Sequence, residues 1–241
     1  MLKLLSIALL TVFLSGCASL FNQSEDDWTV EQFYERAKSE LDSRQWSKAI
    51  EYYEKLKANY PYGDHAEQAY LELAYAYYRY DEPLSAMREL DEFIRLYPRH
   101  SQLPYAYYLK ALAAESINRS WLDRFVTDPA SRDTQSTLEA YRAYQEVITR
   151  FPDSQYAVIS KQKLVILTNR LARRDLEVAN YYYRRGAYLA AANRAQTVLE
   201  DYPRSQSTRQ ALRLLYDAYQ KLDMPENAHQ IRAILEHNEM L

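Results

Sequence analysis

The strongest constraint on the fold of this chain is a pattern of alanine and proline that recurs four times. An aromatic residue followed by proline occurs at Tyr60-Pro61, Tyr97-Pro98, Phe151-Pro152 and Tyr202-Pro203. Twelve residues before each of these prolines stands an alanine, at Ala49, Ala86, Ala140 and Ala191. A second alanine lies twelve residues earlier in three of the four segments, at Ala37, Ala74 and Ala179, and an insertion displaces its counterpart in the third, Ala111. A fixed period of this kind indicates an array of structural repeats.

Each repeat is interpreted as two antiparallel helices. A small side chain on each helix lets the two axes approach to roughly 8–10 Å, and the proline after the second helix cannot continue the helical hydrogen bonds. Gly186 lies between the two helices of one repeat, the usual place for a left-handed cap. The whole chain contains only 3 glycines, which leaves little material for β-hairpins. The sequence therefore predicts an all-α fold.

The repeats resemble the tetratricopeptide repeat. The closest unit contains Val178-Ala179, Tyr182, Gly186, Tyr188, Ala191 and Pro203. The resemblance implies a right-handed α-solenoid, a superhelix of about five helix pairs, over residues 29–241. The predicted units span residues 30–63, 67–100, 104–153, 172–204 and 209–238. An insertion, 118–135, interrupts the third unit, and an extra helix, 154–171, precedes the fourth. A long insertion is often functional; a solvated loop is the alternative.

The N-terminus has the pattern of a secretory leader. Lys3 is followed by an apolar run that ends in Leu14-Ser15-Gly16-Cys17, and this run is shorter than the roughly 20 residues of a membrane-spanning helix. The segment resembles the lipobox of bacterial lipoproteins. By that resemblance residues 1–16 are a signal peptide, Cys17 carries the acyl chains, and Ala18 after it favours export to the outer membrane. The polar residues 17–28 are expected to form a lipidated tether; an ordinary cleaved signal is the alternative.

The titratable residues give no sign of catalysis or metal binding. The 4 histidines are His65, His100, His229 and His237. They have neither the helical pairing nor the neighbouring ligands of a metal site, and no Gly-x-Ser-x-Gly elbow occurs. Glu115-Ser116 is similar to the catalytic pair of lytic transglycosylases, but Glu115 is expected to be an exposed helix residue. The formal net charge of −3 gives no general attraction to nucleic acid, so no nucleic-acid partner is expected. Because no catalytic or metal-binding pattern occurs, we also expect no cofactor and no enzymatic activity.

A set of motifs in a fixed order narrows the resemblance further. They are the lipobox, five repeats, Phe93-Ile94-Arg95-Leu96, an insertion with Ser131-Arg132-Asp133, Ser154-Gln155-Tyr156, Tyr181-Tyr182, Arg185-Gly186-Ala187-Tyr188 and Asn193-Arg194. This combination resembles the BamD family, the lipoprotein subunits of the outer-membrane β-barrel assembly (BAM) machinery. The resemblance implies a lipid-anchored scaffold that faces the periplasm. It also implies three sets of partners: the POTRA region of a BamA-like barrel protein, BamC- and BamE-like lipoproteins, and the C-termini of unfolded barrel proteins.

Two groups of residues are candidates for binding these partners. In the family, the Asn-Arg motif of the fourth unit lies at the contact with BamA, which here corresponds to Asn193 and Arg194. The repeat register places a second group on the inward face of the first three units, namely Tyr34, Lys38, Tyr75, Tyr78, Arg79, Tyr105 and Tyr108. Tyrosines suit peptide capture, and Lys38 or Arg79 could pair with a terminal carboxylate. Packing between repeats is the alternative role for these tyrosines.

The anchor and the repeats alone are compatible with another function. A periplasmic tetratricopeptide lipoprotein could instead act as an adaptor for peptidoglycan hydrolases or for cell division. The insertion in the third unit and the context of Asn193-Arg194 favour outer-membrane assembly.

Overall fold

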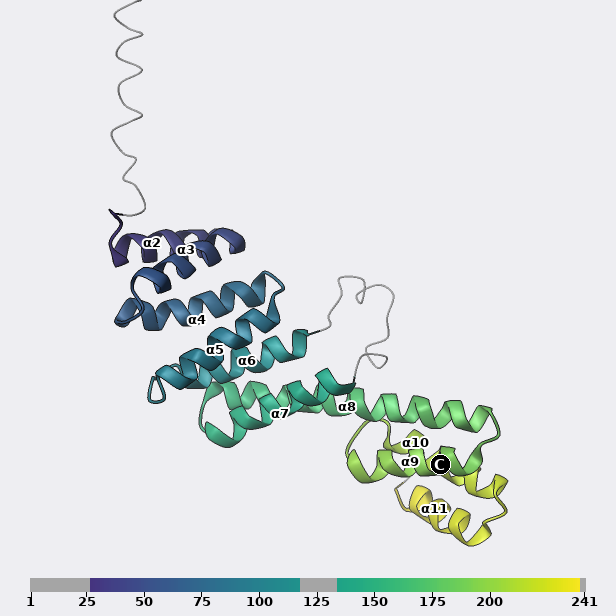
Figure 1. Ribbon diagram of the computed structural model, residues 1–241. Coiled ribbons are helices and arrows are strands. Elements are labelled where there is room, and N and C mark those ends of the chain that lie inside the picture. Colours follow the sequence, from purple (N-terminus) through teal and green to yellow (C-terminus); the bar gives the residue numbers. More distant parts are fainter. Residues whose placement is uncertain (1–26, 118–133, 239–241) are drawn as a thin grey trace, which may run out of the picture. The chain divides into compact units, whose positions relative to one another are not determined.

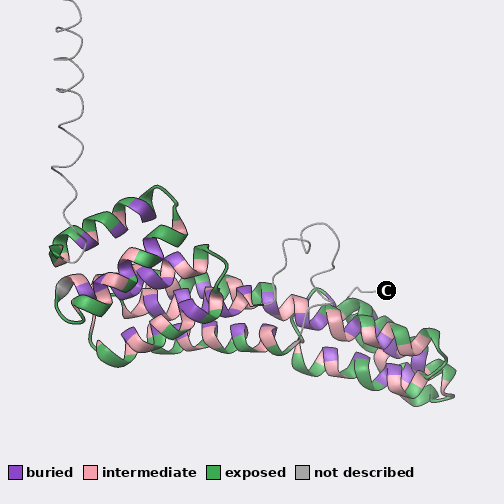
Figure 2. Ribbon diagram, turned by 45° about the horizontal axis from the view of Figure 1, so that its top comes forward, coloured by how far each residue is buried: buried purple, intermediate pink, exposed green. Residues whose placement is uncertain are grey.

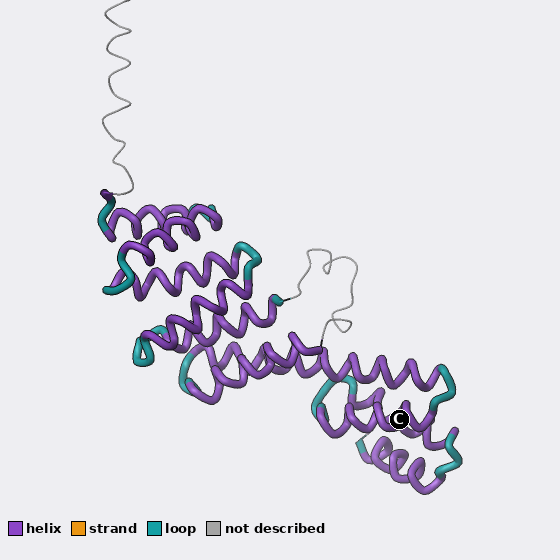
Figure 3. The backbone as a smooth tube through the Cα atoms, in the orientation of Figure 1, coloured by secondary structure: helices purple, strands orange, loops and turns teal. Residues whose placement is uncertain are grey.

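The computed structural model describes residues 27–117 and 134–238 (Figure 1). Within these two ranges the chain forms ten helices, α2 to α11, and no strand (Figure 3). The predicted all-α fold class is confirmed. The predicted signal peptide, Cys17 and residues 118–133 of the predicted insertion lie outside the described residues. Of the helices in these ranges, none is both long enough and apolar enough to span a membrane.

The helices follow one another as five pairs, as expected of a tetratricopeptide array. The described connections within and between pairs are short, whereas residues 117–133 separate the two helices of the third pair. Their bounds are α2 Val30–Asp42 and α3 Trp46–Asn59, α4 Asp64–Arg79 and α5 Pro83–Leu96, α6 Leu103–Ser116 and α7 Thr134–Arg150, α8 Gln155–Arg184 and α9 Tyr188–Asp201, and α10 Thr208–Lys221 and α11 Pro225–His237. The chain divides into two compact units, residues 1–76 and 77–241, and the division falls inside α4.

The alanines of the repeat pattern lie where the helices cross. All of them are fully buried: Ala37, Ala49, Ala74, Ala86, Ala111, Ala140, Ala179 and Ala191. Buried residues gather on the sides of the helices that face a neighbouring helix (Figure 2). In the C-terminal unit, for example, Ala179, Val198 and Ala218 belong to one cluster from α8, α9 and α10. Because each crossing is lined by a residue without a long side chain, the helices pack closely enough to exclude water.

The turns between paired helices share one backbone feature. Gly186 has a φ of +76°, which confirms the predicted left-handed cap. Arg44, Asp81 and Asp223 also have positive φ, at 59°, 67° and 56°. Each of these four residues stands two positions before the second helix of its pair. A residue with positive φ ends the first helix and turns the chain, so that the next helix runs antiparallel to the first.

The structure differs from the predicted boundaries in three places. The predicted extra helix, 154–171, and the first helix of the fourth unit are a single helix, α8, of 30 residues. Gln135, predicted to end the insertion, lies in the first turn of α7. Trp28, placed in the tether, packs against Phe33 and Tyr52 with ring centroids 5.2 and 5.8 Å apart. Trp28 therefore packs as part of the folded N-terminal unit and not as part of the tether.

Candidate functional site

A polar cluster in the N-terminal unit joins three helices. The hydroxyl of Tyr53, a fully buried residue of α3, donates a 2.5 Å hydrogen bond to Oε2 of Glu72 in α4. Nζ of Lys38 in α2 lies 2.8 Å from Oδ1 of Asp42 and 3.7 Å from Oε1 of Glu72. Burial and the Glu72 carboxylate raise the pKa of Tyr53 above its ordinary value and that of Tyr34 to about 12. These two phenols are therefore neutral hydrogen-bond donors at every physiological pH.

This cluster changes the role expected of Lys38. Its ammonium group already pairs with two carboxylates, those of Asp42 and Glu72. The hydrogen bond to Asp42, with the Glu72 charge, raises the pKa of Lys38. One positive and two negative charges leave a local excess of negative charge, which disfavours a further carboxylate. Lys38 is thus a poor candidate for capturing a terminal carboxylate.

The two tyrosines predicted for the groove of this unit are half-buried and packed against other rings. Tyr34 lies against Tyr53 and His65, with centroids 6.3 and 4.9 Å apart. Tyr75 meets Trp46 edge-on at 6.1 Å. Each ring contributes to packing between helices and also keeps part of its surface in solvent.

A second polar cluster occurs in the C-terminal unit. The buried Tyr144 of α7 donates a 2.6 Å hydrogen bond to Oε2 of Glu115 in α6, and Nζ of Lys163 in α8 lies 2.9 Å from the same oxygen. Burial raises the pKa of Glu115, but the hydrogen bonds from Tyr144 and Lys163 and the charges of Lys163 and Arg170 outweigh it and hold the pKa below its usual value. The expectation that Glu115 is an exposed residue is wrong, because its side chain is only 12% exposed.

The two clusters lie at the same position in their repeats, but the repeats that supply the carboxylate and the lysine are exchanged. Tyr53 and Tyr144 each stand four residues after the crossing alanine of their repeat, Ala49 and Ala140. Around Tyr53 the carboxylate comes from the following repeat and the lysine from the same one, whereas around Tyr144 the origins are reversed. Both clusters satisfy a buried hydroxyl with a charged acceptor, as a buried polar group requires.

The remaining predicted groove residues belong to the C-terminal unit. Tyr108 and Tyr105 pack against Tyr156 of α8, with ring centroids 5.2 and 5.7 Å apart. Tyr78 is half-buried, and Arg79 at the end of α4 is exposed. The repeat register does not predict that Tyr156 belongs with Tyr105 and Tyr108. The spacing of seven residues between Tyr156 and Lys163 would have placed both on one side of α8.

Asn193 and Arg194, the candidate partner contact, are both exposed on α9. The backbone carbonyl of Asn193 accepts a 3.1 Å hydrogen bond from the hydroxyl of Thr197. Leu189, one turn earlier, is 60% exposed, which is unusual for a large apolar residue. Burial raises the pKa of Asp175 in α8, and the charges of Arg174 and Arg194 oppose this rise. The face therefore combines an exposed leucine, an amide and a guanidinium group.

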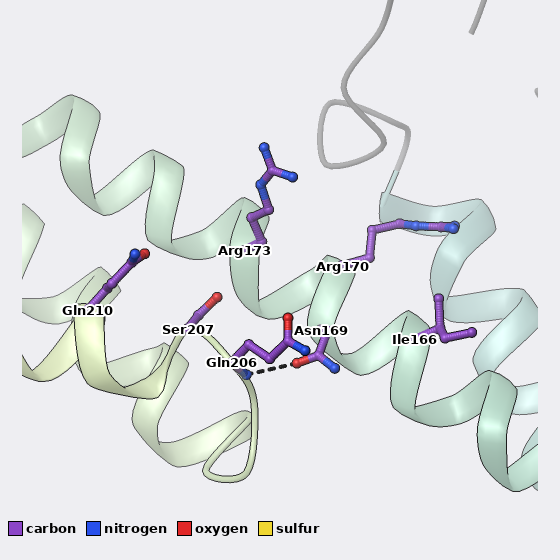
Figure 4. A pocket seen from close by; sticks show the side chains of 7 residues that line it. All are labelled: Ile166, Asn169, Arg170, Arg173, Gln206, Ser207 and Gln210. Carbon is purple, nitrogen blue, oxygen red and sulfur yellow. Dashed lines mark hydrogen bonds between the residues drawn. The ribbon is translucent and has the colours of Figure 1, made fainter. Parts of the chain in front are cut away.

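A pocket of about 530 Å³ lies between α8 and the start of α10 (Figure 4). Its lining residues are Ile166, Asn169, Arg170, Arg173, Gln206, Ser207 and Gln210. Oδ1 of Asn169 accepts a 2.8 Å hydrogen bond from the backbone N–H of Gln206, which ties the loop before α10 to α8. Throughout residues 27–117 and 134–238, no three His, Cys, Asp or Glu side chains gather as a metal site would require.

Comparison with known proteins finds relatives that cover nearly the whole chain. A family model described as YfiO, outer membrane lipoprotein, matches residues 26–234. The outer membrane protein assembly factor BamD of Neisseria meningitidis serogroup B is 38% identical, over 99% of this chain and 91% of that protein. BamD of Vibrio cholerae is 33% identical over 93% of both. The solved tetratricopeptide domain of P58(IPK) aligns with 87% of this chain and 51% of its own length, at 14% identity and a TM-score of 0.45. On the family match and the full-length relatives, this chain belongs to the BamD family of outer membrane protein assembly factors.

Proposed function

We propose that this chain is a lipid-anchored scaffold of outer-membrane protein assembly that faces the periplasm and holds a barrel-forming subunit and its unfolded substrates. Membership of the family supports the role in assembly. The lipobox supports acylation at Cys17, and several acyl chains give stable anchoring where one would not. A protein-binding role without catalysis is consistent with relatives that are named assembly factors.

The exposed face of α9 is the proposed contact with the barrel-forming subunit through its POTRA region. The observation that carries this assignment is the exposure of Leu189 next to Asn193 and Arg194. Interfaces are typically built from an apolar centre with arginine and polar residues around it. The resemblance to the family also assigns its Asn-Arg motif to Asn193 and Arg194.

The half-buried tyrosines are the proposed contacts with the C-terminal segments of unfolded barrel proteins. In the C-terminal unit, Tyr105 and Tyr108 present part of their rings to solvent, next to Tyr156. A tyrosine face offers apolar area at a low entropy cost. Lys38 already pairs with Asp42 and Glu72, so it is not proposed as the cation for the terminal carboxylate.

The first test is co-purification from membranes. The full lipidated chain carries a C-terminal affinity tag and is extracted in mild detergent, and the proteins that accompany it are identified. We expect a barrel protein with POTRA domains, lost with Arg194→Glu and weakened with Leu189→Ser. Leu84→Ser is the matched control, because Leu84 is also exposed but lies on α5.

Two results would contradict the proposal. Recovery of cell-wall hydrolases without the barrel protein would reject the assembly role of the scaffold. Retention of the barrel protein by the Arg194→Glu and Leu189→Ser variants would reject α9 as the contact.

A further inference from the structure

Tyr62, in the turn between α3 and α4, is an aromatic residue that the fold does not use. Among the exposed large apolar side chains of the described residues it has the largest exposed fraction, 84%. Three other repeats carry a charged residue at the same position, directly after the proline. These residues are Arg99, Asp153 and Arg204, and all of them are exposed. Because a charged residue suits this turn, the ring of Tyr62 indicates contact with a surface outside the described chain.

The turn that carries Tyr62 lies beside the start of α2. On one side of the turn, the hydroxyl of Tyr60 donates a 2.7 Å hydrogen bond to the backbone carbonyl of Trp28. On the other side, Nε2 of His65 lies 4.0 Å from Oε1 of Glu31 in the first turn of α2. Both flanks of the turn are therefore held at the end of the N-terminal unit where the chain enters its first helix (Figure 1).

The ring of Trp28 fixes this point of entry. It is stacked on Tyr52 and tilted against Phe33, with centroids 5.8 and 5.2 Å apart. The ring of Tyr52 also receives Arg36 and Lys55, at 5.4 and 5.1 Å from its centroid. Because these contacts join Trp28 to both α2 and α3, the segment between Cys17 and the folded unit has its end at Trp28.

The segment between Cys17 and Trp28 is short. Trp28 stands eleven residues after Cys17, which limits the distance between the two residues to about 40 Å. An anchor at Cys17 therefore keeps the turn with Tyr62 close to the lipid surface. A short tether raises the effective concentration of a second contact to about the millimolar range, so that even a weak contact forms. Tyrosine and tryptophan are the residues that favour the headgroup level of a bilayer.

We propose that the turn between α3 and α4 rests on the headgroup region of the membrane that holds the acyl chains, with the ring of Tyr62 as its main contact. The occupant of this surface is a lipid bilayer, because the turn adjoins the tether and a single ring offers too little area for a stable protein interface. The inference rests on the proposed acylation at Cys17. It adds an orientation: the end of the N-terminal unit with Trp28 and Tyr62 faces the lipid, and the end with residues 43–45 faces away.

The contact is apolar rather than ionic. Residues 27–76 contain six Lys and Arg against ten Asp and Glu, so an anionic lipid surface would repel the unit as a whole. A neutral, zwitterionic surface carries no such penalty, and a phenol can place its ring among the apolar groups while its hydroxyl stays in water. The contact should therefore depend little on salt.

The test uses the full acylated chain in vesicles of phosphatidylcholine, with a fluorophore at one end or the other of α3. The acyl chains block Cys17, the only cysteine, so the thiol of Ala58→Cys or Ser47→Cys is labelled alone. Both residues are exposed. Lipids with a nitroxide on the headgroup quench the label at short range. The two sites are about 16 Å apart along the helix, and we expect quenching at position 58 to be at least about threefold stronger than at position 47.

Variants of Tyr62 test the role of its ring. Tyr62→Ser is expected to reduce the quenching at position 58 about threefold or more, and Tyr62→Trp to retain it. Both variants should fold, because the ring packs against so little of the unit. Tyr80→Ser is the matched control, since Tyr80 is another exposed tyrosine at the end of a helix, in the turn between α4 and α5. A ring with a merely structural role would change stability and leave the quenching as it was.

Three outcomes would overturn the proposal. They are equal quenching at both ends of α3, quenching that Tyr62→Ser leaves unchanged, and crosslinking of a photoreactive residue at position 62 to a protein in cells without quenching by the lipid. The mass of the mature chain reports acylation separately. A chain without acyl chains would reject the proposed anchor; the same labels on a Cys17→Ser chain without the signal peptide, held to chelating lipids by an N-terminal histidine tag, would then decide on the contact.

Discussion

The hydroxyl of Tyr144 donates a 2.6 Å hydrogen bond to Oε2 of Glu115, and both groups lie out of bulk water. A buried hydroxyl without an acceptor costs free energy, and an ionised acceptor gives a stronger bond than a neutral one. The pair of Tyr53 and Glu72 repeats this relationship in the N-terminal unit. The two clusters thus join consecutive helix pairs through polar bonds as well as apolar packing.

Removing the Tyr144 hydroxyl is expected to destabilise the C-terminal unit. Tyr144→Phe keeps the ring and leaves Glu115 without one charge-assisted hydrogen bond, so the free energy of unfolding should fall by about 1.5–3 kcal/mol. Chemical unfolding followed by circular dichroism measures the change. Tyr107→Phe is the control, because Tyr107 contributes through its ring, which contacts Phe151 and Arg150. A loss of the same size in both variants would reject the role of the hydroxyl.

The contribution of Glu115 should depend on acid pH. Its pKa in the folded chain is lower than its ordinary value of 4.5. A carboxylate of this kind stabilises the fold above its unfolded pKa, and the stabilisation disappears as the pH falls through the folded pKa. Glu115→Gln should therefore lower the melting temperature clearly at pH 7, and the difference from the original chain should shrink below about pH 4.5.

A surface carboxylate provides the matched control for this pH series. Glu146 pairs with Arg150 four residues away on an exposed side of α7. Because exposed pairs contribute little, Glu146→Gln should change the melting temperature only slightly at any pH. A gap between Glu115→Gln and the original chain that stays constant down to pH 3 would contradict the argument.

The raised pKa values of three buried or half-buried tyrosines predict a loss of stability at alkaline pH. The pKa of Tyr34 is raised from 10.0 to about 12, chiefly by burial and then by Glu72, and those of Tyr53 and Tyr144 are raised as well. A group whose folded pKa is raised stabilises the fold below its unfolded pKa and loses this effect as the pH rises. Stability should therefore fall as the pH rises from 10 towards 12. The absorbance of tyrosinate, followed against circular dichroism, should show that these phenols ionise only as the helices unfold.

The fold could be predicted because the same pattern of alanine and proline recurs in four repeats. The alanines at Ala37, Ala49 and their counterparts must be small in every repeat, since a large residue would push the axes apart. The pairs formed by Tyr53 with Glu72 and by Tyr144 with Glu115 could not be predicted in the same way. Each depends on how two helices are rotated against one another, and no fixed spacing along the chain encodes that rotation.

The interpretation of α8 shows where repeat length misleads. The repeat length predicts a helix boundary at residue 171, because the fourth unit should begin at 172. No glycine or proline occurs between Gln155 and Arg184, so nothing in the backbone ends the helix. Its apolar residues also lie on more than one side: Leu167 is buried whereas Val165 and Ile166 are exposed. Composition alone does not distinguish a buried side of a helix from an exposed one.

The final prediction concerns the left-handed turn at Gly186. A Cβ added to this residue would meet no atom within 4 Å, yet its φ of +76° is a conformation that residues with a side chain rarely adopt. Gly186→Ala should therefore lower the free energy of unfolding by about 1–2 kcal/mol, through backbone strain rather than through a clash. Asparagine tolerates positive φ better than alanine does, so Gly186→Asn should retain most of the original stability. If both variants lost the same amount, a steric or packing cause would replace the conformational one, because strain at φ distinguishes the two residues and crowding at Cβ does not.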